Sequence, residues 1–224
     1  MGEAIAWTSF GTALREAGRA GEAIDAHTRA RALYQTAGVH HSEAFAWNNL
    51  GIALREAGRA GEAIDAHTRA RDLFQAAGDR PREALAWNNL GLSLEVAGRV
   101  GEAVEVHTRA RDLFQAAGDR HREARAWHGL GIALRRAGRV VEAVEGYGRA
   151  LEGYREFEDW YGAGQVLHNL ALIHKDAGRS AEARTCWLQA ADAYTRAGDT
   201  AKADQARTWA EEQQEPPPTP PLTP

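Results

Sequence analysis

Three histidines recur at a spacing of forty residues, at His27, His67 and His107. Imidazole is a common ligand of transition metals, so this series is the first candidate for chemistry. Equivalent positions of stacked helical repeats lie about 8–10 Å or more apart, whereas metal–nitrogen bonds are about 2 Å long. One ion therefore cannot be shared, and we expect the rings to pack in the interior, in the slot that Tyr147 and Trp187 occupy in the fourth and fifth copies. We expect no metal and no cofactor.

A second series places side-chain amides at Asn49, Asn89 and Asn169. An asparagine amide supplies both a donor and an acceptor, so a row of them can pair with the backbone of an extended peptide without reading its side chains. The alternative is that Asn49 and Asn89 are copied residues that tie neighbouring helices together. We expect these amides to contact a peptide.

Motifs for catalysis are missing from the sequence. It has no glycine-rich phosphate loop, no H-E-x-x-H pair and no G-x-S-x-G elbow, and its only lysines are Lys175 and Lys202. Cys186 is the single cysteine, so the chain offers neither an internal disulfide nor a cysteine pair for a metal. We therefore expect that this protein is not an enzyme.

Charge and hydropathy argue against two further kinds of partner. The 224 residues include 27 Lys and Arg against 31 Asp and Glu, without the basic face that neutralising phosphates requires. No apolar run approaches the roughly 18 residues of a membrane helix, and no signal sequence is recognisable. We expect a cytoplasmic protein that binds neither nucleic acid nor a membrane.

These candidate residues lie in a repeat of forty residues. In the second copy Trp47 and Leu50 begin an apolar stripe at i, i+3, i+4 and i+7, which predicts a helix near 43–57. A second helix is predicted near 60–77, and Gly58 lies where the chain must reverse between the two. The same pattern recurs at Trp7, Trp47, Trp87 and Trp127 and at Gly18, Gly58, Gly98, Gly138 and Gly178.

Proline placement separates two regions of the chain. Six of the seven prolines lie in the last nine residues, and the seventh is Pro81. A long segment that almost excludes the strongest helix breaker is predicted to be all-helical. Residues 215–224 are predicted to form an extended, disordered tail.

The repeated residues resemble the signature of the tetratricopeptide repeat. In the second copy they are Trp47, Leu50, Gly51, Leu54, Ala63, His67 and Ala70. The period of forty residues exceeds the usual 34, and the proline that normally closes the second helix is missing. Both departures indicate a longer second helix, as in the branch of the family that resembles kinesin light chains, LGN-type adaptors and actinobacterial regulators. The resemblance covers about residues 2–200 and implies a right-handed α-solenoid of helix-turn-helix units.

The expected organisation is five tandem repeats followed by a capping helix and the tail. The boundaries are 1–40, 41–80, 81–120, 121–160 and 161–200 for the repeats, 201–214 for the helix and 215–224 for the tail. We expect no capping element before the first repeat, whose sequence is nearly as apolar as that of the second. We therefore expect either that the chain is part of a longer array or that it self-associates through its first repeat.

The side of each first helix that faces away from the tryptophan row is expected to line a concave groove. Its middle is apolar, and a cluster of cations near the fourth repeat could hold a carboxylate. The alternative for the cations is a solvated helix end, which the helix dipole favours. The candidate contacts are Asn49, Asn89 and Asn169, the apolar Phe45, Leu85, Leu92 and Ile132, and the charged Arg125, Arg135 and Arg136.

The resemblance implies a scaffold whose groove binds a peptide or protein segment. Repeat proteins of this kind generally act by presenting a surface, so this inference depends partly on analogy. Three alternatives remain: a homo-oligomerisation module that uses the first repeat, a regulatory or sensor fragment similar to those of actinobacterial transcription or signalling regulators, and a decaying copy without function.

Overall fold

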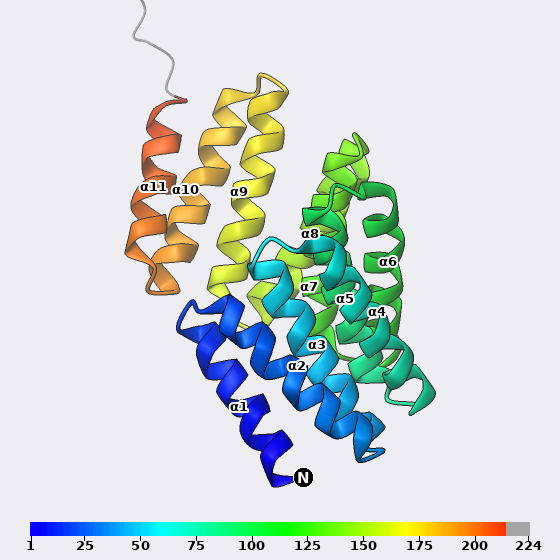
Figure 1. Cartoon of the computed structure of the whole chain (residues 1–224). Helices are drawn as coiled ribbons and strands as arrows, with labels where there is room; N and C mark the ends of the chain where they lie inside the picture. Colours follow the sequence, from blue (N-terminus) through cyan, green and yellow to red (C-terminus); the bar gives the residue numbers. More distant parts are fainter. Residues whose placement is uncertain (214–224) are drawn as a thin grey trace, which may run out of the picture. The chain divides into compact units, whose positions relative to one another are not determined.

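The computed structural model describes residues 1–213, and these residues form helices joined by short turns (Figure 1). The predicted tail at 215–224 lies outside the described residues. Of the described residues 85% are helical and none forms a strand, which confirms the all-α solenoid class. The helices are α1 (Gly2–Glu16), α2 (Ala20–Thr36), α3 (His40–Glu56), α4 (Ala60–Ala76), α5 (Arg80–Val96), α6 (Val100–Ala116), α7 (Arg120–Arg136), α8 (Val140–Glu156), α9 (Trp160–Asp176), α10 (Ser180–Arg196) and α11 (Thr200–Glu211).

Glycine ends most of these helices. At the end of α3, Gly58 has a φ of 77°, and its N–H donates to the carbonyl of Arg55 at 3.0 Å. The next N–H, of Arg59, donates back to the carbonyl of Leu54 at 2.8 Å, so two otherwise unpaired carbonyls are satisfied. Glycine adopts this left-handed backbone without the steric cost that a side chain imposes. The repeated glycines thus fix where the chain reverses.

Aspartate caps four of the helices at their N-termini. Asp79 accepts a hydrogen bond from the backbone N–H of Arg82 at 3.2 Å, and Asp119 accepts one from that of Arg122 at 3.0 Å. Asp159 and Asp199 do the same at the starts of α9 and α11. Each cap satisfies an N–H that has no partner within its helix. Helix α5 tolerates Pro81 because this residue lies in the first turn, where a backbone donor has no partner within the helix.

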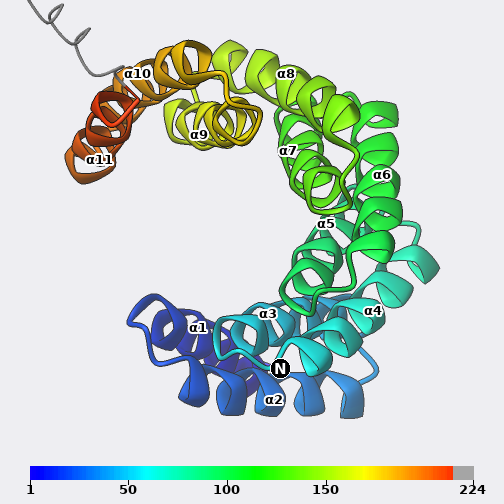
Figure 2. The ribbon, with the colours of Figure 1, turned by 90° about the horizontal axis from the view of Figure 1, so that it is seen from above.

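The chain divides into two compact parts, Met1–Ala143 and Val144–Pro224, which we call the N-terminal and C-terminal parts. In the N-terminal part, each helix packs on the next one along the chain, and α1, α3 and α5 also contact α3, α5 and α7, respectively. Figure 2 shows α1, α3, α5 and α7 on the inner, concave side of this part and α2, α4 and α6 on its outer side.

Alanine and tryptophan together form the repeated core of the N-terminal part. Alanines such as Ala63 and Ala70 are fully buried where helices cross, which lets the backbones approach closely. Trp47 is half-buried and packs beside this core, together with Leu73 and Phe74. Since the same side chains recur in the neighbouring repeats, each helix pair buries a face that it could not bury alone.

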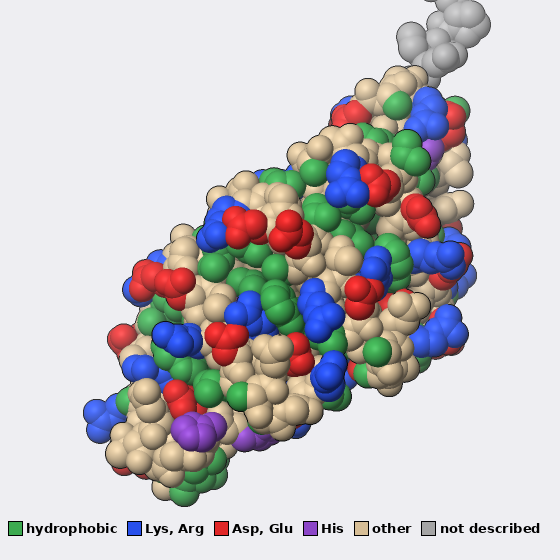
Figure 3. All heavy atoms as spheres, turned by 90° about the vertical axis from the view of Figure 1, so that its right-hand side faces the viewer, with side chains coloured by type: hydrophobic (Ala, Val, Ile, Leu, Met, Phe, Trp, Pro, Cys, Tyr) green, Lys and Arg blue, Asp and Glu red, His purple; other side chains and the backbone are tan. Residues whose placement is uncertain are grey.

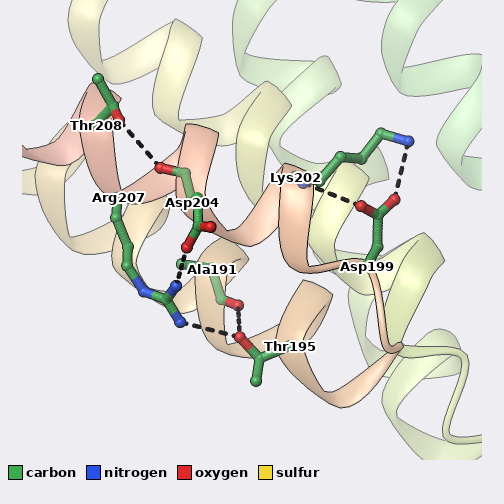
Figure 4. A network of polar contacts seen from close by, with 7 residues as sticks. All are labelled: Ala191, Thr195, Asp199, Lys202, Asp204, Arg207 and Thr208. Atoms are coloured by element: carbon green, nitrogen blue, oxygen red, sulfur yellow. Dashed lines mark hydrogen bonds and ion pairs between the residues drawn. The ribbon is translucent and has the colours of Figure 1, made fainter.

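The C-terminal part contains α8 from Val144 onward and all of α9, α10 and α11. Trp187 is 1% exposed and packs with Ala171, Ala183 and Trp209. Polar contacts on α10 and α11 support this packing (Figure 4). Arg207 of α11 donates to Asp204 at 2.6 Å and to the hydroxyl of Thr195 on α10 at 3.1 Å. Helix α11 is thereby attached to α10 by side chains as well as by its apolar face.

Within residues 1–213, no helix is both long enough and apolar enough to cross a bilayer.

Candidate functional site

The periodic histidines pack as rings against glycine. His27, His67 and His107 are 0% exposed. A Cβ built on Gly51 would lie 2.6 Å from the ring of His67, and one on Gly11 would lie 2.7 Å from that of His27. The packing interpretation of this series is therefore confirmed. Among residues 1–213, no three His, Cys, Asp or Glu side chains gather in a way that could hold a metal ion.

Burial keeps two of these histidines neutral. It lowers the pKa of His27 to about 4 and that of His67 to about 3, and the nearby cations Arg15 and Arg55, respectively, act in the same direction. Neither ring nitrogen of His27 or His67 has a hydrogen-bond partner among the described residues. A protonated ring would therefore lose its hydration without any compensating contact.

The third histidine has a different neighbour. Glu95 stands where the first and second repeats have Arg15 and Arg55, and its Oε1 lies 2.7 Å from Nε2 of His107. Both side chains are buried. Arg136 of α7 donates from Nη1 to the backbone carbonyl of Glu95 at 2.7 Å, so the end of α5 is tied to α7. Arg136, a predicted groove cation, thus already has a role between helices.

The asparagine row is not uniform. Asn89 is 7% exposed, and its Nδ2 donates to Oδ1 of Asn48 on α3 at 2.9 Å. This bond joins neighbouring first helices, which is the role that the alternative interpretation gave it. One repeat later, the residue equivalent to Asn89 is Gly129, which has no side chain to bond Asn88. A Cβ at Gly129 would lie 2.5 Å from the ring of His107, so this position has no room for an asparagine. The Oδ1 atom of Asn88 is accordingly buried without a partner among the described residues.

Asn49 has a different environment from Asn89. The residue forty-one positions before it is Thr8, whose hydroxyl donates to the carbonyl of Ala4 at 2.9 Å. Asn49 is half-buried, and its amide makes no hydrogen bond with any residue in the range 1–213. It borders a hollow of about 220 Å³ between α1 and α3, together with Thr8, Tyr34, Ser42 and Phe45. We call this space the α1–α3 hollow.

The predicted apolar contacts lie on successive first helices of the N-terminal part. Phe45 on α3, Leu85 and Leu92 on α5 and Ile132 on α7 are all half-buried. The ring of Phe45 meets that of Phe74 edge-on, with centroids 5.2 Å apart. The guanidinium of Arg82 covers the same ring at 4.7 Å. This row therefore presents apolar surface while it is held by the core behind it.

The predicted cations of α7 also differ from one another. Arg125 is exposed and forms no ion pair with any residue that the structure describes. Arg135 is half-buried, and Arg136 binds the Glu95 carbonyl. Of the three, Arg125 is the cation whose charge is most available to a ligand.

The outer face of the N-terminal part carries no large patch of one charge. Figure 3 shows the side of the molecule on which α4 and α6 lie, with basic and acidic side chains intermixed and hydrophobic ones between them. At the start of α4, Arg59 pairs with Glu62, and at the start of α6, Arg99 pairs with Glu102 at 2.6 Å. Exposed pairs of this kind contribute little to stability, but they neutralise the face locally.

A larger hollow lies in the C-terminal part. It measures about 400 Å³ and is bordered by the end of α8, by α9 and by α10. Its walls include Arg155, Trp160, Ala163, Leu167, Ala193 and Arg196. We call it the α8–α10 hollow. Asn169, the third predicted amide, is half-buried on α9 in this part of the chain.

Family comparison decides the assignment of these repeats. A family model of the tetratricopeptide repeat matches residues 2–76 and 82–156, and a second model of the same repeat matches residues 164–197. The chain belongs to the tetratricopeptide repeat family. No curated protein matches the sequence of this tetratricopeptide chain.

Solved structures resemble the tetratricopeptide chain in fold at low sequence identity. Aspartyl phosphate phosphatase F from Bacillus subtilis has a TM-score of 0.69 at 11% identity over 96% of this chain. A Rap protein in complex with Competence and Sporulation Factor has a TM-score of 0.76 at 13% identity over 95% of it. The chain spans 60% and 65% of the length of these two proteins. BtubC (BKLC) from P. vanneervenii has a TM-score of 0.63 at 15% identity, with 93% of this chain and 96% of that one covered.

Tetratricopeptide repeats act as scaffolds for protein–protein interaction, and the architecture of this chain supports a scaffold function. Two features of the tetratricopeptide chain were missed from the sequence. The first is the Glu95–His107 pair, although Glu95 visibly interrupts a row of cations. The second is the α8–α10 hollow, whose signal was the change from tryptophan to Leu167 in the fifth repeat.

Proposed function

We propose that the concave face of the N-terminal part binds an extended peptide or protein segment. The observation that carries this proposal is the half-buried amide of Asn49, which has no partner in residues 1–213 and borders the α1–α3 hollow beside Phe45. A half-buried polar group at the edge of a hollow is stabilised when a ligand supplies the missing hydrogen bonds. The backbone of an extended peptide offers both a donor and an acceptor at the required spacing.

The rest of the face supplies apolar contact and charge. Leu85, Leu92 and Ile132 continue the half-exposed row from α5 to α7, so a ligand that runs along the concave side would cover them in turn. Arg125 offers an unpaired guanidinium at the α7 end and favours an acidic residue in the ligand. Arg135 and Arg136 support this end of the face, and Arg136 does so through its bond to Glu95.

The three asparagines therefore have separate roles in the proposal. Asn49 contacts the ligand, whereas Asn89 holds α5 against α3 through Asn48. Asn169 lies in the C-terminal part and is proposed as an equivalent contact for that part alone.

A binding experiment can separate these roles. Peptides selected from a displayed random library on the full chain are titrated calorimetrically into wild type and four variants. These are Asn49→Ala, Asn89→Ala, Arg125→Ala and Gln35→Ala, the last an exposed control on α2. Loss of the Asn49 hydrogen bonds should weaken binding about tenfold without changing the thermal midpoint. Asn89→Ala should lower the midpoint, because it leaves the buried Asn48 oxygen without its donor. Equal affinity for wild type, Asn49→Ala and Arg125→Ala would reject the concave face as the site.

Self-association through the first repeat is the second candidate, and one observation favours it. Ile5 and Phe10 on α1 are 56% and 51% exposed, which is high for large apolar side chains. Burying them against another copy would recover about 25 cal/mol per Å² of apolar area. Sedimentation at several concentrations should then show a mass that rises with concentration in wild type and stays monomeric in Ile5→Glu. A monomer in both would exclude this candidate.

A further inference from the structure

The α8–α10 hollow occupies a place that is filled in the earlier repeats. In the second repeat, Trp47 lies there beside Leu73, and its Nε1 donates to Oε1 of Glu43 at 3.4 Å. The guanidinium of Arg31, from the preceding second helix, covers the ring at 4.7 Å. An aromatic ring, a carboxylate and a cation thus close this space.

The third and fourth repeats repeat this arrangement. Trp87 donates to Glu83 at 3.2 Å, and the guanidinium of Arg71 lies 4.5 Å from its ring centroid. In the fourth repeat, Trp127 donates to its glutamate at 3.3 Å, and its ring is likewise covered by an arginine at 4.6 Å. The repetition serves as an internal control for what this position normally contains.

The fifth repeat has lost each of these groups. Leu167 stands in place of the tryptophan, Ala163 in place of the glutamate and Leu151 in place of the arginine. In addition, Ala193 replaces the leucine that the first three repeats have on the second helix. The side chains that would fill the space are thus shortened from both α9 and α10. The resulting hollow of about 400 Å³ falls in the size range of small-ligand sites.

The rim of the hollow is positively charged. Arg155 approaches from α8 and Arg196 from α10, and neither guanidinium forms an ion pair with any described residue. Arg196 instead lies over the ring of Trp160, 4.6 Å from its centroid. The one acidic residue of the wall is Asp192, which leaves a net charge of +1 from two arginines and one aspartate. Such a rim attracts a carboxylate, while the alanine and leucine walls accept an apolar group.

We propose that the α8–α10 hollow binds an aromatic side chain with a neighbouring carboxylate, presented by an acidic segment of a partner protein. The ligand supplies the ring and the carboxylate that this repeat lacks, and Arg155 and Arg196 supply the cations. The site is lined by α8, α9 and α10 of the C-terminal part, so it does not depend on the proposal made for the concave face of the N-terminal part.

The test uses the full chain and three short peptides. Acetyl-Asp-Trp-Asp-amide is the probe, and acetyl-Asp-Ala-Asp-amide and acetyl-Lys-Trp-Lys-amide lack the ring and the carboxylates, respectively. Binding is followed by methyl NMR shifts of Ala163, Leu167 and Ala193. The probe should give saturable shifts at these methyls with a dissociation constant at least about tenfold below that of either control peptide. Arg155→Gln should weaken the probe about threefold to fivefold, because it removes one partly exposed charge pair.

Two filled variants provide the matched controls. Leu167→Trp with Ala163→Glu restores the residues of the other repeats, and Ala193→Leu fills the same space from α10 if the double variant does not fold. Each folded variant should lose the saturable shifts. The proposal is wrong if a filled variant binds the probe as wild type does, if no saturable shift occurs, or if the lysine peptide binds equally well.

Two further outcomes identify a different occupant and also overturn the proposal. Free N-acetyltryptophan that binds as tightly as the probe would make this a site for a small aromatic acid and not for a protein segment. A mass that rises with concentration in wild type but not in Ala193→Leu would mean that a second copy of the chain fills the hollow.

Discussion

Repeats two and five have the same helix-turn-helix arrangement, but the space beside the first helix is filled in repeat two and open in repeat five. In repeat two, Trp47 and Glu43 close that space with a ring and a hydrogen bond, and Arg31 of the preceding repeat adds a cation. In repeat five, the smaller Ala163 and Leu167 leave it open. Helix pairing therefore survives loss of the tryptophan, because Trp187 and its alanine neighbours still form a buried core in repeat five.

The ring slot of the second helix differs in the same way. His67 rests on Gly51 in repeat two, whereas repeat five combines Trp187 with Ala171. Trp187 donates from Nε1 to Nδ1 of His168 at 3.1 Å, while His67 has no hydrogen-bond partner in the described residues. The two repeats thus differ in which slot holds the large ring. Repeat two has its tryptophan on the first helix, and repeat five has it on the second.

The largest expected effect comes from giving repeat three the residues of repeat five. Trp87→Leu with Glu83→Ala should lower the free energy of unfolding by about 3 kcal/mol, because it removes a large packed ring and leaves a cavity. Chemical denaturation of wild type and variant measures the change. Trp7→Leu is the control, since no guanidinium covers Trp7 among the described residues, and its loss should be smaller. A double variant as stable as wild type would mean that the tryptophan does not distinguish the two repeats energetically.

A change of about 2 kcal/mol is expected from Gly51→Ala. The added Cβ would lie 2.6 Å from the buried ring of His67, and neither the ring nor the helix can move without disturbing the core. Gly61→Ala is the matched control, because no atom lies within 4 Å of its added Cβ and alanine is the better helix former. Thermal denaturation should show a lower midpoint for the first variant and an equal or higher one for the second. Equal midpoints would show that the His67 ring has room to move away from the added methyl group. Repeat five already combines a ring, that of Trp187, with an alanine, Ala171.

The repeated pattern explains how far the sequence could predict these features. The tryptophan and glycine periods indicated helix pairs, and the helix predicted near 43–57 is α3, which begins three residues earlier, at His40. The roles of Asn49 and Asn89 could not be separated, because both follow an asparagine and precede Leu-Gly. The difference lies forty-one residues away, where Asn89 meets Asn48 and Asn49 has only Thr8. Contacts between repeats depend on two copies at once, and a repeat signature describes one.

As the pH falls, the buried histidine in the ring slot of repeat two should lower the free energy of unfolding by up to about 1.4 kcal/mol per pH unit, whereas a tyrosine in that slot should not. The folded pKa of His67, about 3, lies below the unfolded value of about 6.5, so the unfolded chain takes up the proton first as the pH falls. Stability is therefore complete above pH 6.5 and is lost progressively toward pH 3. His67→Tyr carries the residue of repeat four, Tyr147, which is fully buried in that slot. Between pH 6 and pH 5, the variant should lose about 1 kcal/mol less than wild type in urea denaturation. Parallel losses would show that His67 does not titrate in this range.

The smallest expected effect concerns the turn that leads into repeat five. Glu158 has a φ of 55°, and it is the non-glycine residue with left-handed backbone within residues 1–213. Nine glycines hold the equivalent turn positions elsewhere in this range, including Gly178 with a φ of 71°. Glu158→Gly should raise the free energy of unfolding by about 0.5–1 kcal/mol, since relief of the strained backbone exceeds the entropy that glycine adds to the unfolded chain.

Gly178→Ala is the reverse test of the same turn in the C-terminal part. No atom lies within 4 Å of its added Cβ, so any loss of stability must come from the backbone and not from a clash. The loss should be about 1 kcal/mol, opposite in sign to the gain in Glu158→Gly. Opposite shifts of the two midpoints in thermal denaturation would show that repeat five carries strain at its entry as well as a hollow in its wall. No gain in Glu158→Gly would show that Glu158 adopts its left-handed backbone without strain, and packing would then remain as the energetic difference between repeats two and five.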